Sequence, residues 1–144
     1  MCYNNLIMKH IFEQKVYYAD TDSYGVVWPG SYLRWMEMGR VDLCEELGIN
    51  LQELKAQDIV IPVVGLNIRY KSSARVDDVL IIETYVKKIG GFTVTFEQII
   101  KNKLTGAIYT QAEVEIVAIN NSGKLYRKLP ENLVKLLEGA LCNV

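Results

Sequence analysis

One long helical pattern followed by a row of strand-like runs is the feature that most restricts the fold of this chain. Between residues 30 and 47 the apolar residues recur at spacings of three or four, as they do along one face of a helix. After residue 59, runs rich in β-branched and aromatic residues dominate and are separated by turn residues. The apolar stripe of the predicted helix consists of Tyr32, Met36, Gly39, Leu43 and Leu47, flanked by Leu33 and Cys44.

Five strands are predicted: residues 11–18, 59–70, 79–89, a run that starts at residue 92, and residues 107–120. Alternation is clearest where Phe92, Val94 and Phe96 are separated by polar residues, which is typical of a half-buried strand. Pro130 is predicted to start a short amphipathic helix near the end of the chain. Its apolar residues are Leu133, Leu136, Leu137 and Leu141.

Strands that follow a single helix indicate the α+β class, with an antiparallel sheet packed on that helix. We expect one domain over residues 1–144, with its core at about residues 9–130. One helix covers only one face of a sheet. The other face, or an edge strand, is therefore expected to contact another subunit.

Charge and cysteine content exclude several classes of protein. The 16 Lys and Arg residues nearly balance the 17 Asp and Glu residues, so nothing indicates a nucleic-acid or acidic-membrane partner. The three widely spaced cysteines suggest neither a disulfide framework nor a zinc site. Because we find no signal peptide and no apolar run of membrane-spanning length, we expect a cytoplasmic protein without a membrane segment.

Residues 20–35, DTDSYGVVWPGSYLRW, place two acids just before the predicted helix. Aspartates often cap backbone N–H groups in such loops, so Asp20 and Asp22 could be purely structural. A D-x-D pair can also bind metal, but no third or fourth ligand clusters with it. In the catalytic interpretation, a carboxylate lies beside the unpaired amides of a helix start, which can hold a developing oxyanion. The one histidine, His10, has no nucleophile motif to serve.

The loop resembles the signature of the hotdog-fold acyl-CoA thioesterases, in the 4-hydroxybenzoyl-CoA thioesterase and YbgC-like group. Residues 70–80, YKSSARVDDVL, are similar to a second block of that family. The residues that match the first block are Asp20, Asp22, Gly25, Val26, Val27, Trp28, Tyr32, Arg34 and Trp35.

The resemblance implies a five-stranded antiparallel sheet wrapped around one long helix, with a short C-terminal helix. It implies dimers joined at their sheet edges, which often pair into tetramers, and an active site between subunits. Coenzyme A enters only as part of the substrate, so no cofactor and no metal are expected. The resemblance makes Asp22 the catalytic carboxylate, as nucleophile or general base, and we interpret Asp20 as structural.

The family often has histidine or tyrosine at position 29, and the amide of that residue polarises the thioester carbonyl. Pro29 has no N–H here, so we expect the donor to be Gly30 or Ser31, and Ser31 could also cap the helix. Another hotdog branch uses a helical glutamate as nucleophile, which makes Glu37 an alternative. A salt bridge from Glu37 to Arg34 or Arg40 is the other interpretation of this residue.

Substrate contacts are predicted from two groups of residues. Aromatic residues near the loop could line an acyl pocket or belong to the core and dimer edge. Lysines could bind coenzyme A phosphates or be ordinary surface residues. The aromatic candidates are Tyr24, Trp28 and Tyr32, and the lysine candidates are Lys71, Lys87 and Lys88.

The predicted function is hydrolysis of an acyl- or aroyl-CoA thioester, or of an acyl-carrier-protein thioester. The first alternative is a hotdog protein that binds acyl-CoA but is catalytically weak because of Pro29. The second is a dehydratase or isomerase, which would need His10 in the site.

Overall fold

The structure, a computed structural model, describes residues 9–141. It has five strands, three α-helices and one short 3-10 helix, η1 (Tyr18–Asp20). The strands are β1 (His10–Lys15), β2 (Val63–Tyr70), β3 (Val79–Ile89), β4 (Thr93–Asn102) and β5 (Ile108–Val117). The α-helices are α1 (Pro29–Glu46), α2 (Leu51–Ala56) and α3 (Glu131–Glu138).

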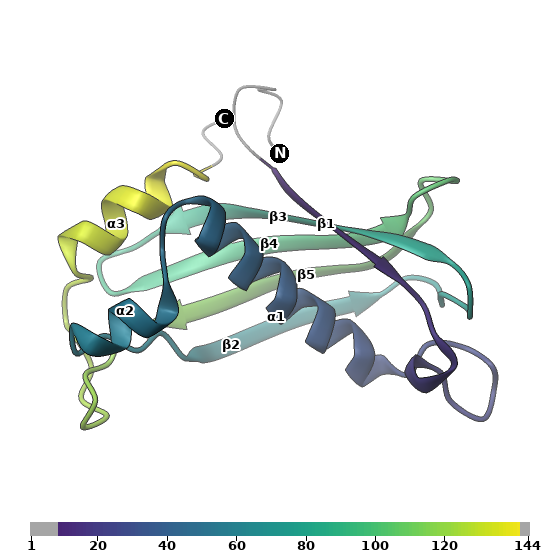
Figure 1. The fold of residues 1–144 in the computed structure, drawn as a ribbon, viewed down its shortest axis with the longest axis horizontal. Helices are drawn as coiled ribbons and strands as arrows, with labels where there is room; N and C mark the ends of the chain where they lie inside the picture. The colour runs from purple at the N-terminus through teal and green to yellow at the C-terminus, as the bar shows by residue number, and fades with distance from the viewer. Residues whose placement is uncertain (1–8, 142–144) are drawn as a thin grey trace.

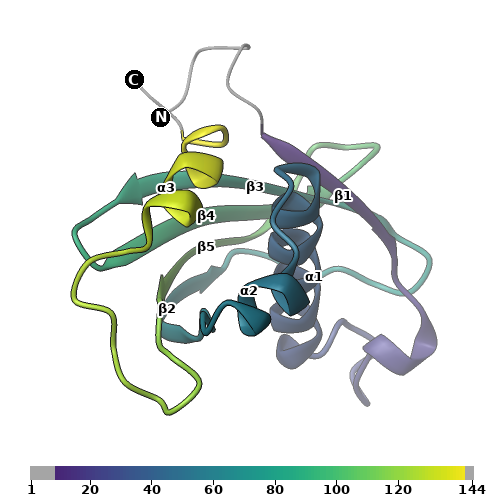
Figure 2. The ribbon, with the colours of Figure 1, turned by 60° about the vertical axis from the view of Figure 1, so that its left-hand side comes forward.

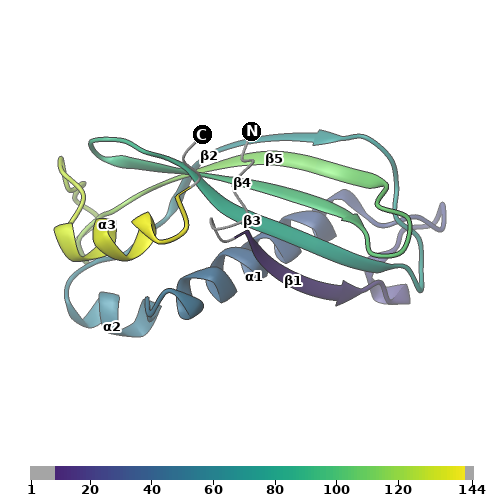
Figure 3. The same cartoon turned by 90° about the horizontal axis from the view of Figure 1, so that it is seen from above.

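All five strands form one antiparallel sheet in the order β1-β3-β4-β5-β2 (Figure 1). Helix α1 runs across one face of the sheet, and α2 and α3 lie on the same side (Figures 2 and 3). The expected α+β fold, a sheet curved around one long helix with a short C-terminal helix, is confirmed. Strands β1 and β2 are the two edges of the sheet.

Several boundaries differ from the sequence prediction. Strand β2 begins at Val63 rather than at residue 59, and β4 begins at Thr93 rather than at residue 92. The first strand ends at Lys15 rather than at residue 18, because the chain turns into η1 there. The strand predicted over residues 107–120 is shorter, and Pro130 precedes α3 rather than lying inside it. The polar stretch after residue 51 is the helix α2, which the prediction missed. Its signal was Asn50, whose side chain caps the helix by accepting from the backbone N–H groups of Gln52 and Glu53.

The apolar core consists of two clusters along α1. The cluster at the start of the helix contains Val27, Tyr32, Trp35, Met36, Leu80, Ile82 and Ile100. The cluster at its end contains Leu43, Cys44, Phe96, Val114 and Ile116, together with Leu54 of α2 and Leu133 and Leu137 of α3. Within residues 9–141, the start of α1 therefore has no other α-helix packed beside it, while α2 and α3 pack near its end.

A buried polar contact fixes α1 on the sheet between these clusters. The fully buried Gln98 side chain donates to the Met36 carbonyl and to Thr84 Oγ1, both at 2.8 Å. It accepts from Arg40 Nη1 at 2.8 Å. Gly39 allows this close approach, since a Cβ there would lie 3.0 Å from Thr84 Oγ1 and from a methyl group of Ile82. The middle of α1 is therefore held in a set position over the sheet.

The two edges of the sheet differ in character. Strand β1, HIFEQK, carries two charged side chains, Glu13 and Lys15, and charged residues are common on protected edges. Strand β2, VVGLNIRY, has a single charged residue, and Val63, Val64 and Leu66 are exposed along it. No helix within residues 9–141 has the length and apolar character needed to cross a membrane.

Candidate active site

The acidic loop is a small hairpin that leads into α1. The Asp22 N–H donates to the Val26 carbonyl at 2.9 Å, and the Gly25 N–H donates to the Asp22 carbonyl at 3.0 Å. Gly25 has a φ of 77°, a left-handed conformation that other residues adopt with strain. No atom lies near the position of a Cβ at Gly25, so backbone conformation rather than space requires the glycine.

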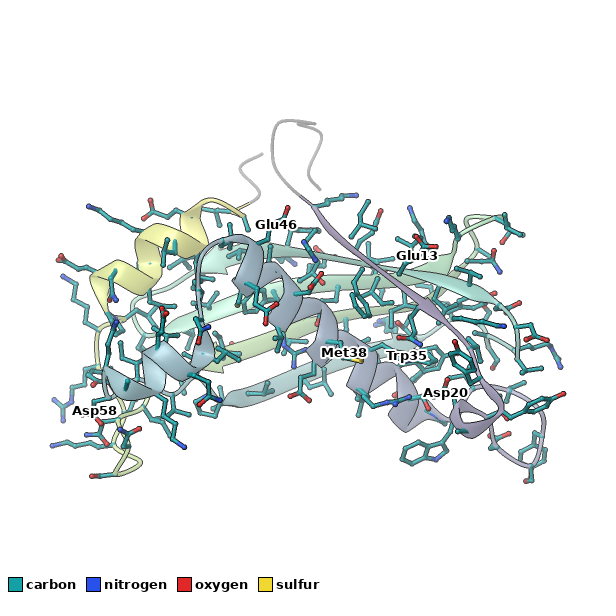
Figure 4. All side chains as sticks on the ribbon, viewed as in Figure 1. Glu13, Asp20, Trp35, Met38, Glu46 and Asp58 are labelled. Carbon is teal, nitrogen blue, oxygen red and sulfur yellow. The ribbon has the colours of Figure 1, made fainter. Side chains whose placement is uncertain are left out.

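Asp20 holds this loop against the start of α1. Its buried carboxylate accepts the Tyr17 N–H at 2.9 Å and is paired with the guanidinium of Arg34. Its carbonyl accepts the Trp28 N–H at 2.8 Å and the Ser31 hydroxyl at 3.1 Å. Figure 4 shows Asp20 where the chain turns from β1 toward α1. The geometry supports the structural role expected for Asp20.

The second sequence block packs against the loop. The Val27 N–H donates to the Ala74 carbonyl at 2.9 Å, and Val26 pairs with Arg75 in an isolated antiparallel bridge. The Ala74 N–H donates to the Tyr32 hydroxyl at 3.0 Å. Two segments some 50 residues apart in the sequence are thus joined at the start of α1 by backbone hydrogen bonds.

Asp22 differs from Asp20 in its surroundings. Its side chain is half-buried, and Oδ1 accepts the Tyr24 N–H at 2.8 Å. Within residues 9–141, Oδ2 of Asp22 has no hydrogen-bond donor and the carboxylate has no ion-pair partner. One oxygen is therefore held by the loop, while the other remains available to an incoming group.

Of the two predicted oxyanion donors, only Gly30 is available. The Ser31 N–H is donated to the Trp28 carbonyl at 2.9 Å, and the buried Ser31 hydroxyl is donated to Asp20. Ser31 also does not cap the helix, because Trp28 occupies the N-cap position without a side-chain bond. No hydrogen-bond acceptor for the Gly30 N–H is found in the described part of the chain. The geometry therefore favours Gly30 as the donor.

The three aromatic candidates divide into two groups. Tyr24 and Trp28 are exposed beside the loop, as a substrate-binding role requires. Tyr32 is 2% exposed and packs edge-on against Trp35 at a ring distance of 5.6 Å, so it is part of the core. Burial also raises the pKa of the Tyr32 hydroxyl. The prediction that Tyr32 binds substrate is not supported by this geometry.

Tyr70 is a residue at the site that the sequence prediction missed. It is the last residue of β2, its hydroxyl donates to the Pro29 carbonyl at 3.4 Å, and its ring lies 5.7 Å from that of Tyr32. The ring is partly exposed at the start of α1. An exposed aromatic residue that ends a strand was the available signal. Lys71 follows directly and is exposed at the same end of the sheet.

Lys87 and Lys88 lie elsewhere in this chain. Strand β3 begins at Val79, near the acidic loop, and these two lysines are close to its other end. Eight residues of extended strand span about 26 Å. The Lys87 ammonium is also paired with Glu113 on β5. Within one subunit, the structure does not bring these lysines to the site.

His10 is buried at the far end of α1. Its ring contacts Asp42 through Nε2 at 2.6 Å and Glu46 through Nδ1. An 18-residue helix is about 27 Å long, so His10 is well separated from Asp22. A dehydratase or isomerase would need His10 in the site, and this position does not support that alternative.

Glu37 borders a separate cavity of about 320 Å³ beside the middle of α1. The other residues that line this cavity include Arg40, Val41, Cys44, Leu51, Ile61 and Phe96. The predicted ion pair from Glu37 to Arg34 or Arg40 is not formed, since Arg34 pairs with Asp20 and Arg40 binds Gln98. Residues 9–141 contain no group of three or more His, Cys, Asp or Glu side chains placed to hold a metal ion.

A carboxylate with one oxygen available, next to a helix start with an unpaired amide, is the minimal equipment for acyl transfer. Together with the sheet curved around α1, this site defines a hotdog-fold hydrolase of acyl compounds.

Comparisons with known proteins agree with that class. Residues 24–108 match the thioesterase superfamily. The protein named acyl-CoA thioester hydrolase YbgC from Escherichia coli O6:H1 is 32% identical over 120 residues, which cover 83% of this chain and 89% of that protein. A probable thioesterase from Bartonella henselae has a similar structure, with a TM-score of 0.77 and 32% identity over 85% of this chain and all of that one. The DHNA-CoA thioesterase from Staphylococcus aureus has a TM-score of 0.80 and 28% identity over 90% of this chain and 86% of its own.

The chain belongs to the thioesterase superfamily. The predicted class of enzyme, a thioester hydrolase, is thereby confirmed.

Proposed function

We propose that this chain hydrolyses the thioester bond of an acyl-CoA, with Asp22 as the catalytic carboxylate and the Gly30 N–H as the oxyanion donor. The observation that carries the proposal is the contrast between two neighbouring acids. The Asp20 carboxylate is buried and paired, while Asp22 keeps one oxygen available beside the start of α1. Coenzyme A as the thiol part is supported by the name of the YbgC relative.

Two routes fit this geometry. In the first, an Asp22 oxygen attacks the thioester carbonyl carbon, the C–S bond breaks, and the thiolate leaves. Water then cleaves the resulting mixed anhydride, which restores the carboxylate and releases the acid. In the second, Asp22 takes a proton from a water molecule that attacks the same carbon, the C–S bond then breaks, and the thiolate leaves and regains a proton as the acid is released. Both routes place negative charge on the carbonyl oxygen, where the Gly30 N–H donates.

Electrostatics at the same end of the sheet fit a substrate that carries phosphate. Lys71 is exposed directly after Tyr70 and forms no ion pair with the described residues. It is therefore the lysine that we propose for coenzyme A phosphate, as a point charge rather than a bidentate fork. A reducing, cytoplasmic location is part of the proposal, because Cys44 is a free thiol inside the core.

A homodimer joined through β2 completes the proposal. An edge strand with exposed valines and a single charged residue is a template for pairing with another strand. Val64→Lys should therefore yield monomers in size-exclusion chromatography with light scattering. Ile11→Lys, on the charged edge β1, is the matched control and should leave the oligomer unchanged. Equal masses for wild type, Val64→Lys and Ile11→Lys would contradict a β2 interface.

Thiol release from a panel of acyl- and aroyl-CoA esters tests the enzymatic part. Wild type should hydrolyse at least one ester, and Asp22→Asn should lower kcat by about 1000-fold or more while the protein stays folded. If no ester is hydrolysed above background but acyl-CoA still binds, the protein is the weak acyl-CoA-binding alternative instead. Loss of activity in His10→Ala would favour the dehydratase or isomerase alternative.

A further inference from the structure

Exposed aromatic side chains gather at the end of the molecule that carries Asp22. Among the described residues, six large aromatic side chains are exposed, and Phe92 in the turn between β3 and β4 is the only one away from this end. The other five are Tyr17, Tyr18, Tyr24, Trp28 and Tyr70. Water-exposed aromatic rings are common at sites where flat or apolar groups bind.

Trp28 lies on the same face of the loop as Asp22. Thr21 and Val27 form a bridge in the loop hairpin, and Asp22 is hydrogen-bonded to Val26. Side chains alternate between faces along extended chain, so Asp22, Val26 and Trp28 share the face opposite Val27. The Val27 side chain is buried in the core, so the shared face is the outer one.

The Trp28 indole packs against the backbone of Gly30, and we call this contact the Trp28 seat. A Cβ built on Gly30 would overlap three atoms of the six-membered part of the indole ring, while most of the ring remains open to solvent. One side of the ring is therefore supported by the first turn of α1. The other side is a flat aromatic surface beside Gly30, on the Asp22 face of the loop.

We propose that the exposed face of Trp28 stacks on the planar acyl group of the substrate, so that the site favours aroyl over alkyl thioesters. This inference rests on the proposed function and specifies its substrate class. An aromatic acyl group is conjugated with its carbonyl and is flat, so it can lie along the indole while its carbonyl oxygen faces Gly30. Aromatic pairs of this kind improve binding by about 3- to 10-fold beyond the area that they bury.

Adenine, at the other end of coenzyme A, is a second planar group that could stack on the same ring. The two cases differ in what binding depends on. If the acyl ring stacks, only ligands with an aromatic acyl group lose affinity when Trp28 is removed. If adenine stacks, every ligand that contains coenzyme A loses affinity, and free coenzyme A does so too.

The test is equilibrium binding by calorimetry of two ketone analogues of coenzyme A that cannot be hydrolysed, S-phenacyl-CoA and S-(2-oxoheptyl)-CoA. Free coenzyme A is the third ligand. The full chain is used as wild type, Trp28→Ala, Trp28→Phe and Gly30→Ala, with Phe92→Ala as the control for an exposed aromatic residue elsewhere. Circular dichroism verifies that each variant is folded.

Trp28→Ala should weaken S-phenacyl-CoA by about 3- to 10-fold and change the alkyl ketone and free coenzyme A by less than about twofold. Gly30→Ala keeps its N–H but displaces the indole, so it should lose the same preference, whereas Trp28→Phe should keep most of it. Phe92→Ala should bind all three ligands as wild type does.

Equal weakening of all three ligands by Trp28→Ala would overturn the inference in favour of adenine, and no weakening at all would overturn it outright. Because binding is measured without turnover, either result stands whatever the outcome of the Asp22→Asn hydrolysis experiment. The inference and the proposed function can therefore fail separately.

Discussion

The two ends of α1 use similar residues for opposite purposes. At its end, Asp42 and Glu46 are both occupied by His10, and the neighbouring Cys44 is sealed among apolar side chains of the sheet, α2 and α3. At its start, the Asp20 carboxylate is paired with Arg34, whereas Asp22 keeps one oxygen available. Within residues 9–141, no other α-helix packs beside these two acids. A paired carboxylate stabilises the fold, whereas a carboxylate with an available oxygen can react. The difference indicates that the start of α1 is less covered by other helices than its end, and that this leaves a carboxylate oxygen accessible to a ligand.

After the loss of the Asp22 carboxylate, removal of a single hydrogen-bond donor at the start of α1 should have the largest effect. Replacing Gly30 with glycolic acid by semisynthesis turns its N–H into an ester oxygen and leaves the Trp28 seat unchanged. We expect kcat for the best thioester to fall by about 100- to 1000-fold, because the developing oxyanion loses its donor. The same exchange at Gly91, in the turn between β3 and β4, is the control. If the protein with the backbone ester at position 30 and the protein with the ester at position 91 had equal kcat values, the oxyanion donor would not be the Gly30 N–H.

Asp20→Ala should lower the free energy of unfolding by about 2 kcal/mol, because the Tyr17 N–H and the Arg34 guanidinium lose their acceptor. The exposure of Arg34 keeps the loss below that of a fully buried pair. Glu13→Ala, which breaks an exposed ion pair with Lys103, should cost less than about 0.5 kcal/mol. Urea unfolding measures both values. Similar losses in the two variants would remove the distinction between structural and surface acids.

His10→Ala tests the closed end of α1. It should lower the free energy of unfolding by about 1 kcal/mol, because Asp42 and Glu46 lose their shared partner although both remain half exposed to water. Thioester hydrolysis should proceed at the wild-type rate per folded molecule, since the site is at the other end of the helix. A fall in kcat without a change in the free energy of unfolding would show that His10 contributes to catalysis from the opposite end of α1, which would contradict this account.

Cys44 should show the smallest effect, which is protection from alkylation. Burial raises the pKa of its thiol to about 11, so the reactive thiolate is scarce at about pH 8. Because the pKa is raised by folding, this protection is complete at lower pH and fades as the pH approaches about 11. Peptide mapping after iodoacetamide treatment should find Cys44 unmodified in folded protein and modified in denaturant. Rapid modification of folded protein would show that this end of the core is open.

Periodicity was enough to predict the arrangement of the core. The stripe at spacings of three and four in α1 and the alternation in β4 follow from which side chains are buried, and both appear in the structure. Two predicted members are exceptions, because Leu33 is exposed on α1 and Phe92 is exposed in the turn before β4. The helix α2 was missed because its composition is polar, although Asn50 signalled its start. The exact ends of the strands depend on turns such as η1, and turns show no repeating pattern of apolar residues from which their position could be predicted.

The site was predictable only in part, because the role that each residue can take depends on which of its polar groups already form hydrogen bonds within the fold. Sequence spacing makes Gly30 and Ser31 equivalent, and only the fold shows that Ser31 has given both of its donors to Trp28 and Asp20. Sequence spacing also does not show how far Lys87 and Lys88 lie from Asp22 within one subunit, because that distance depends on the length and direction of β3. Tyr70 comes near Pro29 only through the pairing of β2 with β5.

The most direct test of the account compares two substitutions that differ by two positions and change the same group. kcat should be measured for Asp22→Asn and Asp20→Asn on one thioester, at equal concentrations of folded protein. The account predicts that Asp22→Asn loses at least about 1000-fold, while folded Asp20→Asn stays within about tenfold of wild type. Asp22→Asn protein that hydrolyses the ester at the wild-type rate would contradict it.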